Sequence, residues 1–135
     1  MTTDPLDVVQ TMLVVDDEPA ICELIAAVAD GAGFRTQTAS DCRDIDRLVG
    51  GGQDITVLDL DLDLGPRDGD VLRLLAVRAP GSRIVLVSGA SAEVVSDAHR
   101  RAASYGLRVV GSLRKPFDLS AFRVVLSRCR NTVSA

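Results

Sequence analysis

The sequence is poor in aromatic residues: its 135 residues include three Phe, one Tyr and no Trp. Its core must therefore be aliphatic, and hydrophobic residues of all kinds make up 47% of the chain. Charged residues account for 25%, close to the globular average, which excludes a wholly disordered chain. The length suits a single domain.

Paired cysteines, long apolar runs and an excess of positive charge are also missing. Cys22, Cys42 and Cys129 are odd in number and form no Cys-x-x-Cys pair, which argues against a disulfide framework or a zinc site. No apolar run approaches the roughly 18 residues of a membrane span, and the first residues lack the pattern of a signal peptide. The net charge of −4 argues against nucleic acid as the main partner. We therefore expect a cytoplasmic domain with no membrane and no nucleic-acid partner.

Short apolar runs alternate with amphipathic segments along the whole chain. Strands are predicted at 12–15, 34–39, 55–58, 84–87 and 107–110, and helices at 18–30, 41–49, 70–78, 92–105 and 119–130. This alternation predicts an α/β fold, a doubly wound parallel sheet of five strands flanked by five helices. We expect the domain to span residues 11–130, with flexible ends at 1–10 and 131–135.

Polar side chains follow the predicted strands, where open parallel sheets bind their ligands. Asp16 and Asp17 follow the first strand, Asp59 the third and Ser88 the fourth, while Lys115 comes after the fifth. Carboxylates this close repel one another, and a hard cation such as Mg²⁺ relieves that repulsion. One carboxylate could then act as nucleophile toward a phosphoryl group whose oxygens contact the serine and the lysine.

These segments resemble a response-regulator receiver domain of two-component signal transduction. The matching segments, in order, are Leu13-Val14-Val15-Asp16-Asp17-Glu18, Asp54-Ile55-Thr56-Val57-Leu58-Asp59, Asp68-Gly69, Val87-Ser88-Gly89 and Lys115-Pro116-Phe117. The resemblance implies a flavodoxin-like receiver fold, a cis Lys115-Pro116 bond, and Mg²⁺ held by the acidic pair. It also implies phosphotransfer from a histidine kinase or phosphotransfer protein to an aspartate, and signalling to a downstream output protein or domain without turnover of a separate substrate. Formation of a homodimer stays open.

The phosphoacceptor itself is ambiguous, because Asp59, Asp61 and Asp63 alternate with leucines. Counting from Asp54 in the family pattern favours Asp59, whereas counting back from Asp68-Gly69 favours Asp61. If Asp61 were the acceptor, Asp59 would be an unpaired carboxylate inside a buried strand, which is costly. We therefore take Asp59 as the acceptor, and the resemblance then makes Asp61 the residue that lends a backbone carbonyl to Mg²⁺.

The sequence departs from the family pattern in two further places. The stretch between Ser88 and Lys115 is about five residues longer than in a typical receiver, so we expect an extended fourth helix or loop. The fifth strand usually carries an aromatic residue three positions before the lysine, and here that position is Ser112. The usual aromatic switch is therefore missing.

Three other interpretations remain open. Val57-Leu58-Asp59-Leu60-Asp61 resembles the first motif of haloacid-dehalogenase-like phosphatases, although the acidic pair would then come too early in the chain. A pseudo-receiver that docks without phosphorylation is the second alternative. A calcium loop starting at Asp59 is the third, but it would place Leu64 where glycine is needed.

Overall fold

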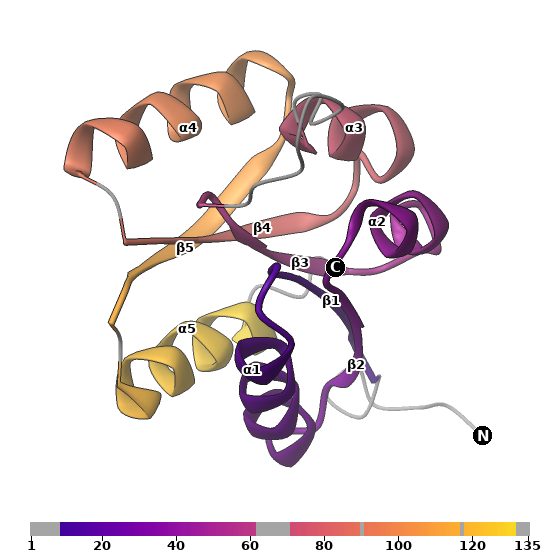
Figure 1. Cartoon of the computed structure of the whole chain (residues 1–135), viewed down its shortest axis with the longest axis vertical. Coiled ribbons are helices and arrows are strands. Elements are labelled where there is room, and N and C mark those ends of the chain that lie inside the picture. Colours follow the sequence, from indigo (N-terminus) through magenta and orange to yellow (C-terminus); the bar gives the residue numbers. More distant parts are fainter. Residues whose placement is uncertain (1–8, 62–70, 90, 117, 132–135) are drawn as a thin grey trace.

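The computed structural model describes residues 9–61, 71–89, 91–116 and 118–131. In this part of the chain, strands and helices alternate (Figure 1). The strands are β1 (Thr11–Val15), β2 (Arg35–Ala39), β3 (Ile55–Asp59), β4 (Arg83–Ser88) and β5 (Arg108–Arg114). The helices are α1 (Pro19–Gly31), α2 (Cys42–Leu48), α3 (Val71–Arg78), α4 (Ala92–Ser104) and α5 (Leu119–Asn131).

The strands form one parallel sheet in the order β2-β1-β3-β4-β5, which confirms the predicted doubly wound fold. Helices α1 and α5 cover one face, while α2, α3 and α4 cover the other (Figure 1). Alternate residues of each inner strand enter one of two hydrophobic cores, so that Val14 and Val57 share a core with Phe122 while Val15 and Leu58 share the other with Leu72. The sheet buries its apolar side chains on both faces, as parallel sheets do.

The sequence of each strand matches its position in the sheet. All five residues of the central strand β3 are buried, and its one mid-strand polar side chain, Thr56, shares a 2.8 Å hydrogen bond with the Ser82 hydroxyl. The edge strand β2 is the most polar, and of its residues only Ala39 is fully buried. Polar residues on an exposed edge cost little, whereas a polar residue in a central strand needs a partner.

Strand β5 differs from the sequence prediction. It runs for seven residues to Arg114, beyond the predicted end at residue 110, because Gly111 and Ser112 interrupt its apolar run without ending the ladder. Ile84 pairs with Val109 and Val85 with Gly111, so Val110 is the extra residue of a β-bulge.

The strand order changes direction between β1 and β3, because the chain leaves β1 toward β2 on one side and returns to β3 on the other. Ligands of doubly wound sheets bind at the carboxyl ends of the strands at such a switch point. Asp16 and Asp17 directly follow β1, and Asp59 is the last residue of β3. Among the described residues, no helix is long and apolar enough to cross a membrane.

Candidate functional site

Three carboxylates meet at the switch point. Asp16 and Asp59 are buried, with 1% and 3% of their surfaces exposed, while Asp17 is exposed. Each offers an oxygen that lies within 4.8 Å of the other two. The Asp16 carboxylate is held in place by the backbone N–H of Glu18, which donates to Oδ1 at 2.9 Å. The predicted convergence of these side chains is thus present in the structure.

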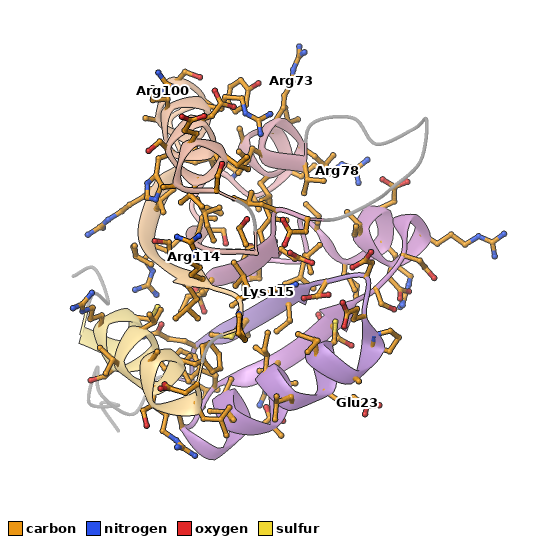
Figure 2. The ribbon with its side chains drawn as sticks, turned by 60° about the vertical axis from the view of Figure 1, so that its left-hand side comes forward. Glu23, Arg73, Arg78, Arg100, Arg114 and Lys115 are labelled. Atoms are coloured by element: carbon orange, nitrogen blue, oxygen red, sulfur yellow. The ribbon has the colours of Figure 1, made fainter. Side chains whose placement is uncertain are left out.

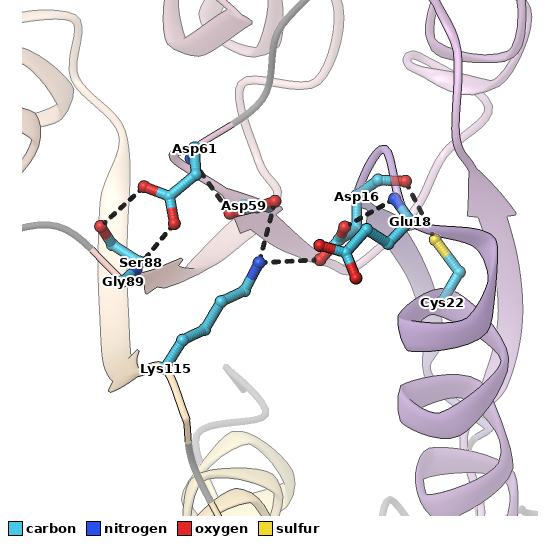
Figure 3. A network of polar contacts seen from close by, with 8 residues as sticks. All are labelled: Asp16, Glu18, Cys22, Asp59, Asp61, Ser88, Gly89 and Lys115. Atoms are coloured by element: carbon cyan, nitrogen blue, oxygen red, sulfur yellow. Dashed lines mark hydrogen bonds and ion pairs between the residues drawn. The ribbon is translucent and has the colours of Figure 1, made fainter.

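Lys115 supplies a positive charge to this cluster. Its Nζ lies 3.1 Å from Asp59 Oδ2 and 3.4 Å from Asp16 Oδ2 (Figure 3). The backbone of Lys115 extends the sheet ladder by donating to the Ser88 carbonyl at 2.8 Å, and the peptide bond to Pro116 is cis, as the resemblance implies. Lys115 is half-buried, whereas Glu23 on α1 and Arg73 on α3 are exposed and project outward (Figure 2).

The electrostatic environment disfavours the ionised form of Asp59. Burial raises the pKa of its carboxyl, and the charge of Asp16 adds to this, while the Asp61 backbone N–H and Lys115 partly oppose it. For Lys115, burial lowers the pKa, but its contacts with Asp59 and Asp16 outweigh burial and leave the pKa above its usual value. The lysine therefore carries its positive charge at neutral pH and contacts two of the three clustered carboxylates.

The donor set fits a divalent cation. Asp59 Oδ2 is buried and accepts no hydrogen bond from the described residues. Its contact with Lys115 is an ion pair. Mg²⁺ prefers sites with few carboxylates, where it keeps several water ligands and can also bind an anionic ligand such as a phosphate. Asp16, Asp17 and Asp59 are the residues that could hold the ion.

Asp61 and Ser88 form a second contact beside the carboxylate cluster. The Ser88 hydroxyl donates to Asp61 Oδ1 at 3.2 Å, and the backbone N–H of Gly89 donates to Asp61 Oδ2 at 2.7 Å (Figure 3). The backbone N–H of Asp61 in turn donates to Asp59 Oδ1 at 3.0 Å. The contacts of the Asp61 carboxylate with Ser88 and Gly89 could not be predicted from the sequence, because no motif links these distant positions.

Two expected features can be placed only in part. Asp63, Asp68 and Asp70, on which the calcium-loop interpretation and the count from Asp68-Gly69 depend, lie outside the described residues. Ser112 is described: it is exposed on β5, where it pairs with Leu86 of β4. No aromatic side chain occupies this position of the strand.

A parallel sheet with an acidic cluster at its switch point and a lysine after its last strand is the layout of a signalling receiver. The family model of the response regulator receiver domain matches residues 12–127. The chain therefore belongs to the response regulator receiver family of two-component systems, as its motifs predicted. Receiver domains are signalling domains and generally not classical enzymes, and the phosphatase interpretation is not favoured.

Solved structures agree with this assignment. CheY4 of Vibrio cholerae, a chemotaxis protein, is 18% identical with a TM-score of 0.71, and the match covers 90% of this chain and 99% of that one. NtrX of Brucella abortus is 26% identical with a TM-score of 0.77, over 93% of this chain and 28% of that one. A Burkholderia pseudomallei response regulator with a phosphorylated aspartic acid is 21% identical with a TM-score of 0.69, over 92% and 70%. No significant match was found among curated proteins.

Proposed function

We propose that this receiver domain accepts a phosphoryl group on Asp59 from a phosphohistidine of a histidine kinase or phosphotransfer protein. The observation that carries the proposal is the position of Asp59, buried at the switch point with two other carboxylates within 4.8 Å and the Lys115 ammonium at 3.1 Å. Asp61, the other candidate acceptor, is exposed and lies outside this cluster. The phosphorylated aspartic acid in the Burkholderia pseudomallei regulator supports the same chemistry.

The transfer is a displacement at phosphorus. A carboxylate oxygen of Asp59 forms the new P–O bond, the P–N bond of the phosphohistidine breaks, and the imidazole leaves with its electron pair. Lys115 compensates the charge of Asp59 and its phosphoryl group, and Ser88 donates to a phosphoryl oxygen. Asp16, Asp17 and Asp59 would hold Mg²⁺, with the backbone carbonyl of Asp61 as a further ligand. The ion, when bound, shields the carboxylates from the incoming anion.

The output in this proposal is a changed surface that a downstream protein or domain recognises. In NtrX the matched part is 28% of a longer chain, so a similar domain there is joined to further sequence. We place the boundaries of the domain at residues 11–130, close to the family match at 12–127.

The test is intact-mass analysis after incubation with acetyl phosphate and Mg²⁺. The wild type should gain one phosphoryl group, and hydroxylamine should remove it, as it does from an acyl phosphate. Asp59→Asn should abolish the gain, whereas the matched variant Asp61→Asn should keep it. Labelling that is blocked only by Asp61→Asn would make Asp61 the acceptor, and no labelling of the wild type would favour a pseudo-receiver.

A further inference from the structure

The carboxylate of Asp61 occupies a pair of hydrogen-bond donors at the carboxyl end of β4. One oxygen accepts from the Ser88 hydroxyl at 3.2 Å, and the other accepts from the Gly89 amide at 2.7 Å. The fit is close, because a Cβ atom at Gly89 would lie only 3.3 Å from Asp61 Oδ2. Two adjacent donors that hold both oxygens of one carboxylate form a small anion-binding site, and here the anion belongs to the chain itself.

This internal anion lies beside the proposed phosphoacceptor. The Asp61 backbone N–H donates to Asp59 Oδ1 at 3.0 Å, so the two residues are tied together through one peptide group. A hydroxyl and an amide each have a single hydrogen to donate. Ser88 and Gly89 therefore cannot make these bonds to Asp61 and equivalent bonds to a phosphoryl oxygen at the same time. Like charges also repel, so a phosphoryl group on Asp59 would push the Asp61 carboxylate away.

We propose that the Asp61 carboxylate is an internal competitor of the phosphoryl group: it holds Ser88 and Gly89 in the unphosphorylated domain and must leave them when Asp59 is phosphorylated. This inference rests on the proposed function of Asp59. Asp61 is thus a positioning residue for the loop after β4, and its charge sets how readily the domain accepts a phosphoryl group. On phosphorylation, the phosphoryl group replaces the Asp61 carboxylate as the anion bound by Ser88 and Gly89.

The first experiment compares the rate of labelling by acetyl phosphate with Mg²⁺ in the wild type and in Asp61→Asn. The neutral amide keeps the shape of the side chain but loses the charge and one acceptor oxygen. Loss of a charge-assisted competitor should make labelling faster by about tenfold. Asp46→Asn, an exposed position on α2, removes the same charge elsewhere and should label at the wild-type rate. An equal or slower rate for Asp61→Asn would overturn the proposal.

A double-mutant cycle tests whether the effect passes through the shared donors. In a Ser88→Ala background, where one donor is gone, Asp61→Asn should accelerate labelling by a clearly smaller factor. A merely structural role of Asp61 would give the same factor in both backgrounds. Asp61→Ala provides a second variant with no side-chain acceptor, and its labelling rate should also exceed that of the wild type.

The amide resonance of Gly89 in NMR spectra gives a readout that does not depend on phosphorylation. In the unphosphorylated protein, Asp61→Asn should move the Gly89 proton upfield, because a short bond to a carboxylate is replaced by at most a weaker bond to a neutral amide oxygen. An unmoved resonance would refute the contact even if Asp59 is the acceptor. If neither the wild type nor Asp61→Asn becomes labelled while the resonance moves, then the contact stands and the proposed function of Asp59 fails.

Discussion

The buried side chain of Cys22 belongs to the hydrophobic core and also contacts the backbone of Asp16 in the acidic site. Cys22 lies on the buried face of α1 and is 2% exposed, and its thiol donates to the Asp16 carbonyl at 3.2 Å. Burial, with a further contribution from the charge of Asp16, raises the pKa of this thiol from 9.0 to about 11. Cys22 should therefore be inert toward thiol reagents in the folded protein near neutral pH, because the thiolate is the reactive form.

The shifted pKa of Cys22 predicts a change in stability with pH. A pKa raised by folding contributes stability below the unfolded value of 9.0, and this contribution is lost as pH rises toward about 11. At pH 10 the loss should amount to about 1 kcal/mol relative to pH 8. Urea unfolding at both pH values should show that the gap between wild type and the less stable Cys22→Ala narrows at pH 10. A gap of constant size would contradict the prediction.

Two helices offer a matched test of capping at the scale of elements. The Asp41 side chain accepts from the Asp44 backbone N–H at 2.8 Å and so caps α2, whereas Ser91 stands at the same position of α4 without a side-chain cap. Asp41→Ala should lower the free energy of unfolding by about 1 kcal/mol. Ser91→Ala should lower it by about 0.5 kcal/mol or less. Chemical denaturation measures both, and equal losses would show that the cap contributes nothing.

The element expected to report phosphorylation is α4 with the loop before it. Ser112 has no ring to bury, so a response must pass through another contact that differs between the two states. The contacts of Ser88 and Gly89 with Asp61 are such a difference. Amide exchange with and without beryllofluoride should therefore show its largest change within residues 88–106. Unchanged protection there, with a clear change around Ser112, would exclude this path.

Most of the helices and strands could be predicted from the sequence, because each depends on the pattern of apolar residues within its own segment. The apolar spacing predicts a helix at 18–30, and α1 lies at Pro19–Gly31, with a proline in its first turn and a glycine at its end. The convergence of Asp16, Asp59 and Lys115 was also predictable, because carboxyl ends of parallel strands share one edge of the sheet. The bulge at Val110 and the bond from Ser88 to Asp61 were not, since both depend on the register and loop path of distant segments.

The acidic cluster should make the free energy of unfolding of the domain depend on the Mg²⁺ concentration. Folding brings Asp16, Asp17 and Asp59 together, and an ion that binds only the folded state stabilises it. For a millimolar dissociation constant, 10 mM Mg²⁺ should add about 1–1.5 kcal/mol. Thermal unfolding at constant ionic strength measures the effect.

Two variants separate a specific site from a general effect of divalent ions on an acidic protein. Asp17 is exposed, so Asp17→Asn should fold normally but respond less to Mg²⁺. Asp46→Asn on α2 removes the same charge outside the cluster and should keep the full response. A wild-type melting temperature that is indifferent to Mg²⁺ would remove the basis for a metal site at the switch point.

The bulge in β5 is a position where the strand could be shortened by one residue without moving Lys115 away from the acidic cluster. Val110 is the residue that the ladder skips, and the pairs from Gly111 to Arg114 continue in register with β4 up to the bond between Lys115 and Ser88. Deleting Val110 would straighten the strand and leave Lys115 in place. Deleting a residue from Gly111 to Arg114 while Val110 stays outside the ladder would instead shift the lysine by one position and turn its side chain to the opposite face. The deletion of Val110 is thus the change of strand length that keeps the contact of Lys115 with Asp59.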